Sequence, residues 1–467
     1  MPKVIVSDTF DAEIEVDCLI IGGGAAGLTA ALAAIEAGDS VLIAERDAKL
    51  SGSTALSSGL IPAAETKAQQ AQAINDSRDV FFKDIMAKNK DRADPEHVRA
   101  IVNQIPKTLD WLGANHDIPF KVLDDFLYPG HSHHRMHAVP EVTGQGLVTR
   151  LEQAVMATEA MIVTDAQVTD LVVTGDGVFL GAICQRPDGA SETIAAGRVI
   201  LACNGYGGNP ELVARFIPEM KDAIYFGHPG NQGEAILWGE QLGAGLADLS
   251  GYQGHGSVAH PHGILITWGL MMEGGIQVNL DGQRFSNEHQ GYSEQAVAVL
   301  AQPERTAFDI FDARLCELGR KFEDFRNAED SGAVVTADTA EALADQIGID
   351  PAALTACLQQ CEALAASGEA DIYGRRFDPA TLLAPPYCAV RVTGTLFHTQ
   401  GGLLIDGQAR VRRADGGVFE TIYACGGAAC GVSGPDVSGY LSGNGLLTAL
   451  SLGHLAGSSG GGVRQPE

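Results

Sequence analysis

The earliest hydrophobic pattern is a short apolar run, a glycine-rich turn, an alanine- and leucine-rich stretch and a second apolar run. Residues 17–21 form the first run, which is typical of a strand buried in a parallel sheet. Residues 25–37 carry alanine and leucine at helical spacing and stop at Gly38, a residue typical of a helix C-cap. Residues 41–44 form the second run, which ends on Glu45. The pattern predicts a β-α-β unit, the start of a doubly wound α/β sheet.

Two later apolar runs predict further strands of the same sheet, and the region between them has a different composition. Residues 198–202 precede one glycine-rich turn, and residues 421–425 precede another. Between them, residues 245–365 are rich first in glycine and histidine and then, over 339–366, in alanine, leucine and glutamate. An inserted domain explains this layout better than two tandem domains. We therefore expect a nucleotide-binding domain split into 1–245 and 366–467, an insertion at 246–365 and a flexible tail at 457–462.

Length, composition and charge narrow the class of protein. A chain of 467 residues with 45% hydrophobic and 19% charged residues is expected to be globular and to have more than one core. Its 31 basic and 59 acidic side chains give a formal charge of −28, which repels phosphate backbones and anionic lipids. The sequence shows neither a secretory signal pattern nor an apolar run long enough to cross a membrane. We expect a cytoplasmic protein that binds no nucleic acid and does not insert into membranes.

Cysteine and histidine usage argues against a metal centre and against a disulfide framework. The nine cysteines are scattered, and no pair has the Cys-x-x-Cys spacing. Cys357 and Cys361 lie one helical turn apart in an apolar stretch, so we expect them in a core. The segment 131–137 contains four histidines, but consecutive histidines alternate sides and no second ligand group is evident. We therefore predict that the protein has no metal site.

The turn after the first predicted strand fits G-x-G-x-x-G, with Gly22, Gly24 and Gly27 at the required places. The first glycine permits the tight turn, the second lets backbone approach a pyrophosphate, and the third lets helix and strand pack closely. The helix N-terminus then offers free N–H groups and a partial positive charge to the diphosphate. Glu45 lies 21 positions after Gly24, where a carboxylate can accept both ribose hydroxyls. These features predict a dinucleotide site that does not hold a 2′-phosphate.

The glycine turn does not distinguish NAD from FAD, but the next loop does. Residues 51–59 are small and polar, which suits a loop that runs along a ribityl chain and a flavin edge. We therefore predict FAD as the cofactor.

At this point nearly the whole chain resembles the flavoprotein family of soluble fumarate reductases, succinate dehydrogenase flavoprotein subunits and 3-ketosteroid dehydrogenases. The resemblance implies a Rossmann-like FAD domain with a mainly parallel sheet, and an inserted α+β capping domain. It also implies flavin redox chemistry on a small organic substrate. The motifs that carry it, besides the glycine turn, are Gly52-Ser53-Thr54, residues 199–202 running into 207–210, Gln253-Gly254-His255, Arg284-Phe285-Ser286-Asn287-Glu288, His398-Thr399-Gln400-Gly401-Gly402 and Tyr423-Ala424.

The chain departs from the fumarate reductase pattern at its arginines. Those enzymes hold a dicarboxylate with two arginines and deliver a proton through an Arg–Glu–Arg relay. The resemblance places Tyr292 at the proton-donating arginine, Tyr440 at a substrate-binding arginine, and Trp268 and Met271 at the other relay positions. A tyrosine cannot form the bidentate, permanently charged contact that an arginine forms with a carboxylate. We therefore expect that the chain does not reduce fumarate by the family mechanism.

The two tyrosines match the ketosteroid dehydrogenase branch of the family. The resemblance implies that Tyr292 removes a proton beside a ketone, while Tyr440 and a backbone N–H near Asn444 hold the ketone oxygen. The β-hydrogen then leaves as hydride to flavin N5, and the phenol and N–H stabilise the developing enolate. A free tyrosine has a pKa of about 10, so Tyr292 would need a neighbour that stabilises phenolate. We predict a ketone α,β-desaturase or the reverse enone reductase, acting on a cyclic ketone such as a 3-ketosteroid or an oxocyclohexanecarboxylate.

Other site residues follow from the same resemblance. His398 matches a histidine that hydrogen-bonds a substrate carboxylate, and Arg135 is a candidate for a substrate carboxylate or the flavin N1–C2=O edge. Gly427 stands where the family keeps a flavin-contacting glutamate, and a helix beginning near residues 443–446 should point its N-terminus at the flavin C2=O. The predicted FAD contacts are Gly22, Gly24, Ala25, Ala26, Gly27, Glu45, Arg46, Ser51, Gly52, Ser53, Thr54, Ser58, Gly59, Val168, Ala202, Cys203, Asn204, Gly426, Gly445, Leu446 and Leu447.

Two alternatives stay open at this stage. The first is a reductase or dehydrogenase of an unsaturated carboxylic acid, which needs an arginine at the substrate, supplied by Arg135 or Arg391. The second is a flavin protein without catalysis of its own, such as an electron carrier or redox sensor. The expected partners are a small-molecule substrate and an electron acceptor or donor that the sequence does not name.

Overall fold

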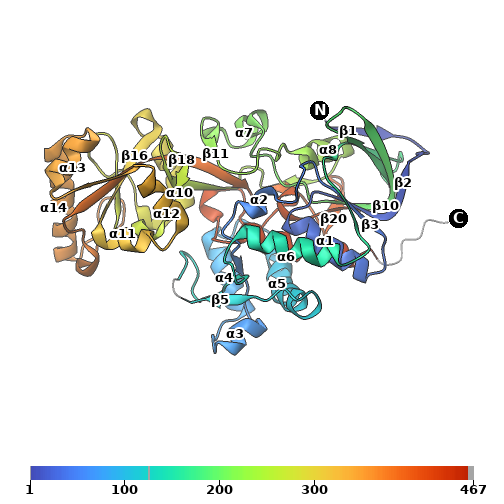
Figure 1. Ribbon diagram of the computed structural model, residues 1–467, viewed down its shortest axis with the longest axis horizontal. Coiled ribbons are helices and arrows are strands. Elements are labelled where there is room, and N and C mark those ends of the chain that lie inside the picture. The colour runs from blue at the N-terminus through green and yellow to red at the C-terminus, as the bar shows by residue number, and fades with distance from the viewer. Residues whose placement is uncertain (1, 125–126, 461–467) are drawn as a thin grey trace. The chain divides into compact units, whose positions relative to one another are not determined.

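The computed structural model describes residues 2–124 and 127–460, and the chain divides into two compact units (Figure 1). Unit 1 comprises Met1–Pro218, Gly227–Tyr252 and His398–Glu467, and unit 2 comprises Glu219–Phe226 and Gln253–Phe397. Unit 2 therefore extends beyond the insertion expected at 246–365. The reason is the long strand β18 (Tyr387–Thr399), which pairs with β13, β16, β17 and β11 in the sheet of unit 2.

Unit 1 is built on a nine-stranded, mainly parallel sheet. Along its main path the strand order is β1-β8-β9-β10-β2-β3-β7, and β21 pairs with β10 and with β20. The pairs of β10 with β2 and β21, and of β3 with β2 and β7, are parallel. The apolar runs predicted as strands lie at its centre. The strands are β1 (Lys3–Val6), β2 (Ile14–Ile21), β3 (Val41–Ala44), β7 (Met161–Val163), β8 (Gln167–Val173), β9 (Phe179–Gln185), β10 (Ser191–Leu201), β20 (Arg410–Arg412) and β21 (Val418–Ala424).

Helices and two small sheets complete unit 1. Among the described residues, no helix combines the length and apolarity that crossing a bilayer requires. The small sheets are β4-β6-β5 (Ile61–Pro62, Met136–Ala138, Lys121–Leu123) and β12-β19 (Leu246–Ala247, Gly402–Leu403). The helices are α1 (Ala25–Glu36), α2 (Gly52–Ala55), α3 (Lys67–Ala71), α4 (Arg78–Lys88), α5 (Pro95–Asn115), α6 (Gly144–Met156), α7 (Pro210–Phe216), α8 (Glu234–Leu242) and α15 (Asn444–Ser458).

Helices α1 and α15 approach each other along small residues. A Cβ at Gly453 would meet the carbonyl oxygen of Ala26 at 2.4 Å, and one at Gly457 would meet that of Ala30 at 2.3 Å. Glycine is therefore required at both positions for backbone to pack against backbone. The flexible tail expected at 457–462 is wrong at its first residues, because Gly457 and Ser458 belong to this packed helix. Residues 461 and 462 lie outside the described part of the chain.

Unit 2 is an α+β unit around a seven-stranded, mostly antiparallel sheet. Its main strand order is β14-β13-β18-β16-β15, with β11 and β17 also paired to β18. The strands besides β18 are β11 (Ile224–Tyr225), β13 (Tyr252–Ala259), β14 (Ile264–Leu265), β15 (Ile276–Val278), β16 (Thr306–Asp312) and β17 (Val334–Ala337). The helices are α9 (Gly269–Met272), α10 (Tyr292–Leu300), α11 (Ala313–Gly319), α12 (Glu323–Asp330), α13 (Ala340–Ile347) and α14 (Pro351–Ser367).

The helical section expected at 339–366 forms two helices, because the sequence contains a helix C-cap followed by an N-cap. Gly348 ends α13 with a left-handed φ of 76°, and Asp350 caps α14 by accepting from the N–H of Ala352. Cys357 and Cys361 are buried in α14, which confirms the core position expected for them.

Candidate cofactor and active site

Four parallel strands of unit 1 end at one edge of the sheet, and the predicted cofactor residues follow those ends. Backbone bonds hold the ends in register: Gly22 N–H donates to Ala44 O at 2.9 Å, and Ala202 N–H donates to Ile21 O at 2.9 Å. Cys425 N–H likewise donates to Leu201 O at 3.0 Å. This edge, at the carboxyl ends of β2, β3, β10 and β21, is where doubly wound sheets bind their ligands.

The glycine turn is shaped by two close contacts and one open position. A Cβ at Gly22, whose φ is 108°, would lie 2.6 Å from Ala202 O, and a Cβ at Gly27 would lie 1.9 Å from Gly22 O. A Cβ at Gly24 would meet, within 4 Å among the described residues, only Thr54 Oγ1 at 3.5 Å. The outer glycines are therefore required by the fold itself. The middle one leaves space at the N-terminus of α1, where a diphosphate can approach.

Glu45 is buried at the end of β3 and its carboxylate already touches the turn. Oε2 accepts from the N–H of Gly23 at 2.7 Å and Oε1 from the N–H of Asp47 at 3.0 Å. Each carboxylate oxygen can accept a second bond, so both remain able to bind ribose hydroxyls. Its neighbour Arg46 instead pairs with Glu234 at 2.5 Å and donates to Gly230 O.

The polar loop predicted to follow the cofactor folds onto the N-terminus of α1. Thr54 Oγ1 accepts from the N–H of Ala25 at 3.1 Å. Ser53 Oγ accepts from the side-chain amides of Asn204 at 3.0 Å and Asn231 at 2.8 Å. Loop 51–54 and the segment after β10 are therefore held together beside the glycine turn.

The side chain of Asn204 explains why position 427 is a glycine. A Cβ at Gly427 would lie 2.2 Å from Asn204 Oδ1, and Asn204 adopts a left-handed φ of 65°. The glutamate expected at position 427 from the family resemblance would collide with this amide, so Asn204 occupies the space that such a side chain needs.

The other predicted FAD residues all belong to unit 1, in the positions that their sequence neighbours dictate. Val168 is buried in β8, Cys203 follows β10, and Gly426 opens a short 3-10 helix with a φ of 59°. Burial raises the pKa of the Cys203 thiol to about 12. Ser58 and Gly59 lead into β4, and Gly445, Leu446 and Leu447 form the first turn of α15. The glycine turn, the carboxylate and the polar loop fit FAD; the individual contacts stay predictions.

Helix α15 begins at Asn444, as the sequence predicted, after Gly443 with a left-handed φ of 87°. A chain of hydrogen bonds leads away from this first residue. Asn444 Nδ2 donates to Ser433 Oγ at 2.9 Å, and Ser433 Oγ donates to Gln400 Oε1 at 2.8 Å. Gln400 Nε2 then lies 2.7 Å from Nδ1 of His398. We call these four residues the amide relay. Asn444 Oδ1 is buried and finds no hydrogen-bond partner among the described residues.

His398 lies beside the start of α15, because a Cβ at Gly445 would come within 3.9 Å of its Cε1 atom. Burial lowers the pKa of His398 to about 4, so its imidazole is neutral at pH 7. Tyr440 is buried four residues before Asn444, and His131 fixes the intervening segment through a 3.0 Å bond to Ser442 O. His398 and Asn444 thus lie together in unit 1, and Tyr440 belongs to the buried segment that leads into α15.

Arg135 is fully buried, and two carboxylates already engage it. Nε and Nη2 contact Asp76 at 3.0 and 2.9 Å, and Nη1 contacts Asp84 at 2.6 Å. The guanidinium also lies 4.6 Å above the ring of Phe81. This geometry gives no support to the contact with substrate or flavin predicted for Arg135. It points to a structural ion pair.

We expect Arg135→Leu to destabilise the protein by about 3–5 kcal/mol, because it leaves the buried Asp76 carboxylate without its counter-charge. Urea denaturation would measure the change. Arg99→Leu is the matched control: its pair with Asp79 is exposed, and we expect a loss of about 0–1 kcal/mol. Unchanged stability with a raised KM would instead place Arg135 at the substrate.

Tyr292 is the first residue of α10 in unit 2. Its ring stacks on that of His255, with 5.0 Å between centroids and 23° between planes. Burial lowers the pKa of His255 to about 3, so His255 brings no positive charge to the phenol. The N-terminal end of a helix favours negative charge, and Tyr292 occupies that end of α10. Trp268 and Met271 are buried, and neither side chain carries a charge.

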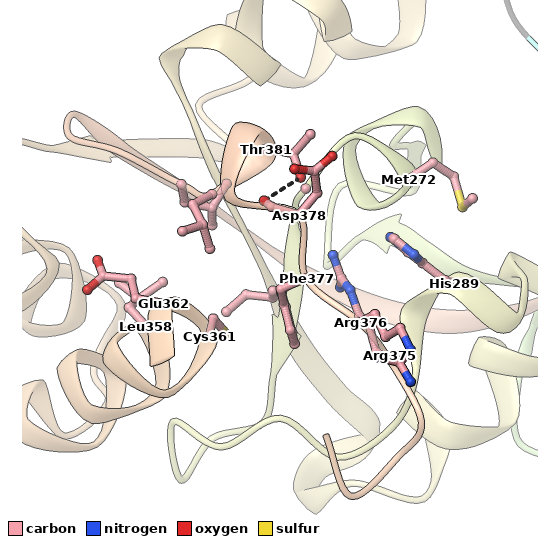
Figure 2. A pocket seen from close by; sticks show the side chains of 14 residues that line it. Met272, His289, Leu358, Cys361, Glu362, Arg375, Arg376, Phe377, Asp378 and Thr381 are labelled. Atoms are coloured by element: carbon pink, nitrogen blue, oxygen red, sulfur yellow. Dashed lines mark hydrogen bonds between the residues drawn. The ribbon is translucent and has the colours of Figure 1, made fainter. Parts of the chain in front are cut away.

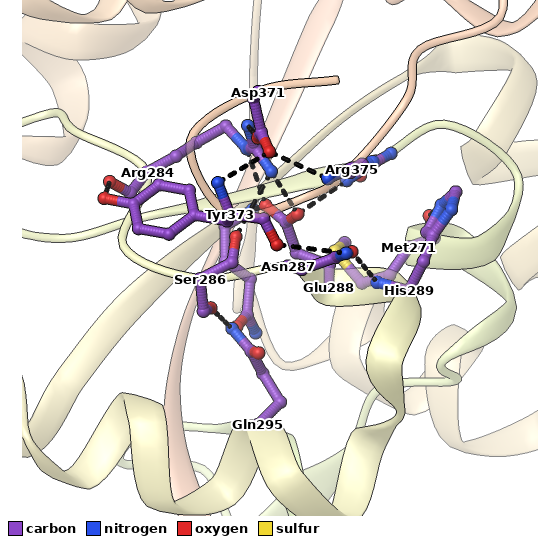
Figure 3. A network of polar contacts seen from close by, with 12 residues as sticks. Met271, Arg284, Ser286, Asn287, Glu288, His289, Gln295, Asp371, Tyr373 and Arg375 are labelled. Carbon is purple, nitrogen blue, oxygen red and sulfur yellow. Dashed lines mark hydrogen bonds and ion pairs between the residues drawn. The ribbon is translucent and has the colours of Figure 1, made fainter.

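The segment before Tyr292 is fixed by an ion-pair network (Figure 3). Glu288, fully buried, contacts Arg284 at 2.6 and 2.9 Å and Arg375 at 2.8 Å, and Arg284 also pairs with Asp371. Burial alone would raise the pKa of Glu288, but the bonds to Arg284 and the charges of both arginines hold that pKa at about 2. The motif Arg284–Glu288 is therefore structural and anchors the chain that leads into α10.

A cavity of about 170 Å³ opens within unit 2 (Figure 2). Arg375, Arg376 and His289 line one side of it, and Glu362 of α14 lies on the other. The residues that line it include no predicted site residue. Among the described residues, no three histidine, cysteine, aspartate or glutamate side chains gather as they would around a metal ion.

Two curated proteins illustrate what the chain is similar to in sequence. One is a probable fumarate reductase, Ifc3, of Shewanella frigidimarina, which is 29% identical over 94% of this chain and 74% of its own length. Another is the 4-oxocyclohexanecarboxylate 2-dehydrogenase of Sinomonas cyclohexanicum, 23% identical over 94% of this chain and 92% of its own length.

Two solved structures share the fold. The open conformation of a flavocytochrome c3 fumarate reductase matches with a TM-score of 0.82 at 27% identity, covering 97% of this chain and 81% of that one. The 3-ketosteroid-Δ4-(5α)-dehydrogenase of Rhodococcus jostii RHA1 matches with a TM-score of 0.77 at 23% identity, covering 99% and all of that chain. They confirm the predicted fold class. The family described as FAD binding domain matches residues 17–446.

Proposed function

Because this chain belongs to the FAD binding domain family, we propose that it introduces or reduces the carbon–carbon double bond next to a ketone. The chain is an FAD-dependent oxidoreductase that acts on CH–CH bonds. The proposal concerns the substrate, for which we favour a cyclic ketone.

One observation carries the proposal: the polar groups that unit 1 gathers at the start of α15 are uncharged. Tyr440 offers a phenol, His398 is neutral because burial lowers its pKa to about 4, and Asn444 is an amide. Such groups suit a carbonyl oxygen, whose negative charge develops only during the reaction. A dicarboxylate instead needs permanent positive charge, best supplied by arginine.

The two arginines considered as substitutes already have partners. Arg135 contacts Asp76 and Asp84, and Arg391 of β18 pairs with Glu304 at 2.5 Å and contacts Thr306. The pair of Arg391 with Glu304 is exposed and therefore weak, but freeing Arg135 would leave the buried Asp76 carboxylate without a counter-charge. This supports a ketone over an unsaturated dicarboxylic acid.

In the proposed reaction, FAD supplies the hydride acceptor or donor when it is bound. Tyr440 and the N–H groups at the start of α15 hold the ketone oxygen and stabilise the enolate-like charge. Tyr292 keeps the role predicted from the sequence: its phenolate takes the α-proton in desaturation, and its phenol returns that proton in reduction.

A flavin-bleaching screen tests the proposal. The purified holoenzyme is mixed anaerobically with saturated cyclic ketones, among them a 3-ketosteroid and 4-oxocyclohexanecarboxylate, and separately with succinate. We expect the flavin absorbance to bleach with a ketone and to stay oxidised with succinate, because desaturation transfers two electrons to the flavin. Bleaching by succinate alone would overturn the proposal and favour a reductase of unsaturated acids.

A further inference from the structure

The amide relay gives His398 a neighbour on only one of its two ring nitrogens. Nδ1 lies 2.7 Å from Gln400 Nε2, an amide nitrogen that can only donate. A ring nitrogen that accepts carries no proton, and a neutral imidazole carries one proton in total. The proton of His398 is therefore on Nε2, the ring nitrogen that the relay leaves uncontacted.

Each hydrogen bond of the amide relay is donated in the same direction, from Asn444 toward His398. Ser433 Oγ accepts from Asn444 Nδ2, and its own hydroxyl proton is directed to Gln400 Oε1. With Oε1 accepting, the other end of the Gln400 amide must donate, which is its contact with His398. All four residues belong to unit 1, and Ser433, Gln400 and Asn444 are buried. Burial makes each bond of the relay costly to break.

We propose that Gln400 is a positioning residue: through Ser433 and Asn444 it holds His398 as the neutral Nε2–H tautomer, a fixed hydrogen-bond donor for a substrate carbonyl oxygen. That Nε2–H meets the substrate rests on the function proposed above, whereas the tautomer itself does not. An uncharged donor selects for a ketone, because a carboxylate gains more from a charged one. The N-terminus of α15 beside His398 also favours the neutral imidazole, because its partial positive charge disfavours imidazolium.

The residue type at position 400 is what sets the tautomer. A glutamate has nearly the shape of glutamine, but its carboxylate can only accept. Gln400→Glu should therefore move the proton to Nδ1 and turn Nε2 into an acceptor. The adjacent negative charge should also raise the pKa of His398. The variant thus changes His398 Nε2 from a hydrogen-bond donor to an acceptor and keeps the packing of the side chain at position 400.

The test is ¹⁵N NMR of the holoenzyme labelled on histidine, without substrate. The signals of His398 are assigned by their loss in His398→Gln. In the wild type we expect a protonated Nε2 and an unprotonated Nδ1, unchanged from pH 8 down to pH 5. In Gln400→Glu we expect the opposite tautomer at high pH and a titration within that range. Gln408→Glu, which adds the same charge on the surface of unit 1, should leave the His398 signals unchanged.

Ser433→Ala provides a second variant in case Gln400→Glu does not fold. It removes the hydroxyl that orients Gln400, so we expect both His398 tautomers to be populated. A wild-type spectrum showing protonated Nδ1, or an unchanged tautomer in both Gln400→Glu and Ser433→Ala, would overturn the proposal. Because the spectra need no substrate, failure here is distinct from failure of the flavin-bleaching screen. With a ketone that bleaches the flavin, Gln400→Glu should lower kcat about 100-fold, which is the lower end of the effect of losing one oxyanion donor.

Discussion

Gly27→Ala is expected to weaken FAD binding by about tenfold or more. A Cβ at this position would lie 1.9 Å from the carbonyl oxygen of Gly22, inside the turn itself. Backbone cannot move aside as a flexible side chain can, so β2 and α1 would separate and the N-terminus of α1 would shift. Overpacking of this kind costs about 1–3 kcal/mol, and each 1.4 kcal/mol is a factor of ten in affinity.

The measurement is the FAD content of the purified variant, followed by titration of the apoprotein with FAD and detection of flavin fluorescence quenching. Gly175→Ala is the matched control: no described atom lies within 4 Å of a Cβ built there, and we expect wild-type FAD binding. Circular dichroism shows whether both variants are folded. Full FAD occupancy and affinity in folded Gly27→Ala would contradict the cofactor site as described.

Tyr292→Phe is expected to lower kcat by about 10²- to 10⁴-fold on a ketone substrate, because it removes the group proposed to transfer the α-proton. The change deletes one hydroxyl and keeps the ring, so the stacking on His255 remains. Substrate affinity should change little. Stopped-flow bleaching of the flavin would measure the effect on the reductive half-reaction directly.

Tyr387→Phe is the control, since Tyr387 begins β18 in the same unit and has no proposed role. The exchange of the substrate α-hydrogen with deuterated water adds a second readout. We expect wild-type enzyme to catalyse this exchange and Tyr292→Phe to lose it. If Tyr292→Phe retained both exchange and flavin bleaching, proton transfer would belong to another residue.

The local elements of the cofactor site could be predicted from the sequence because each depends on neighbours along the chain. The apolar runs at 17–21 and 41–44 gave buried strands, and the small residues between them gave α1. The helix expected near residues 443–446 begins at Asn444. Strand ends then meet at one edge of a parallel sheet for topological reasons, so Gly22 and Glu45 could be placed together without coordinates.

Contacts between distant segments could not be predicted in the same way. The family resemblance suggested a ligand contact for Arg135, but the contacts of Asp76 and Asp84 with it depend on how α4 packs. Ser433 lies in a loop and carries no sequence signal. Gln400 directly follows β18, and residues two apart in an extended chain share a face, so its spacing from His398 is the signal that could have predicted their contact.

The end of the insertion was expected at residue 365, whereas unit 2 continues to Phe397. Composition changes after residue 365, but β18 runs from Tyr387 and joins the sheet of unit 2 by pairing with β16 and β17. Apolar strands look alike in sequence whichever sheet they join. Pairing partners, rather than composition, decide the unit to which a strand belongs.

The close packing of α1 and α15 fixes the distance between the N-termini of these two helices. From the contact Gly453–Ala26 to the contact Gly457–Ala30 the residue number rises by four in both helices, so the two helices run parallel. Gly453 is nine residues into α15, whereas Ala26 is one residue beyond the start of α1. At 1.5 Å per residue, the N-terminus of α15 therefore lies about 12 Å before that of α1 along their common direction. The N-terminus of α1 is predicted to bind the diphosphate and that of α15 the flavin. Because two glycines lock the stagger, the distance between those two anchoring points is set within one rigid pair of helices and does not depend on any loop.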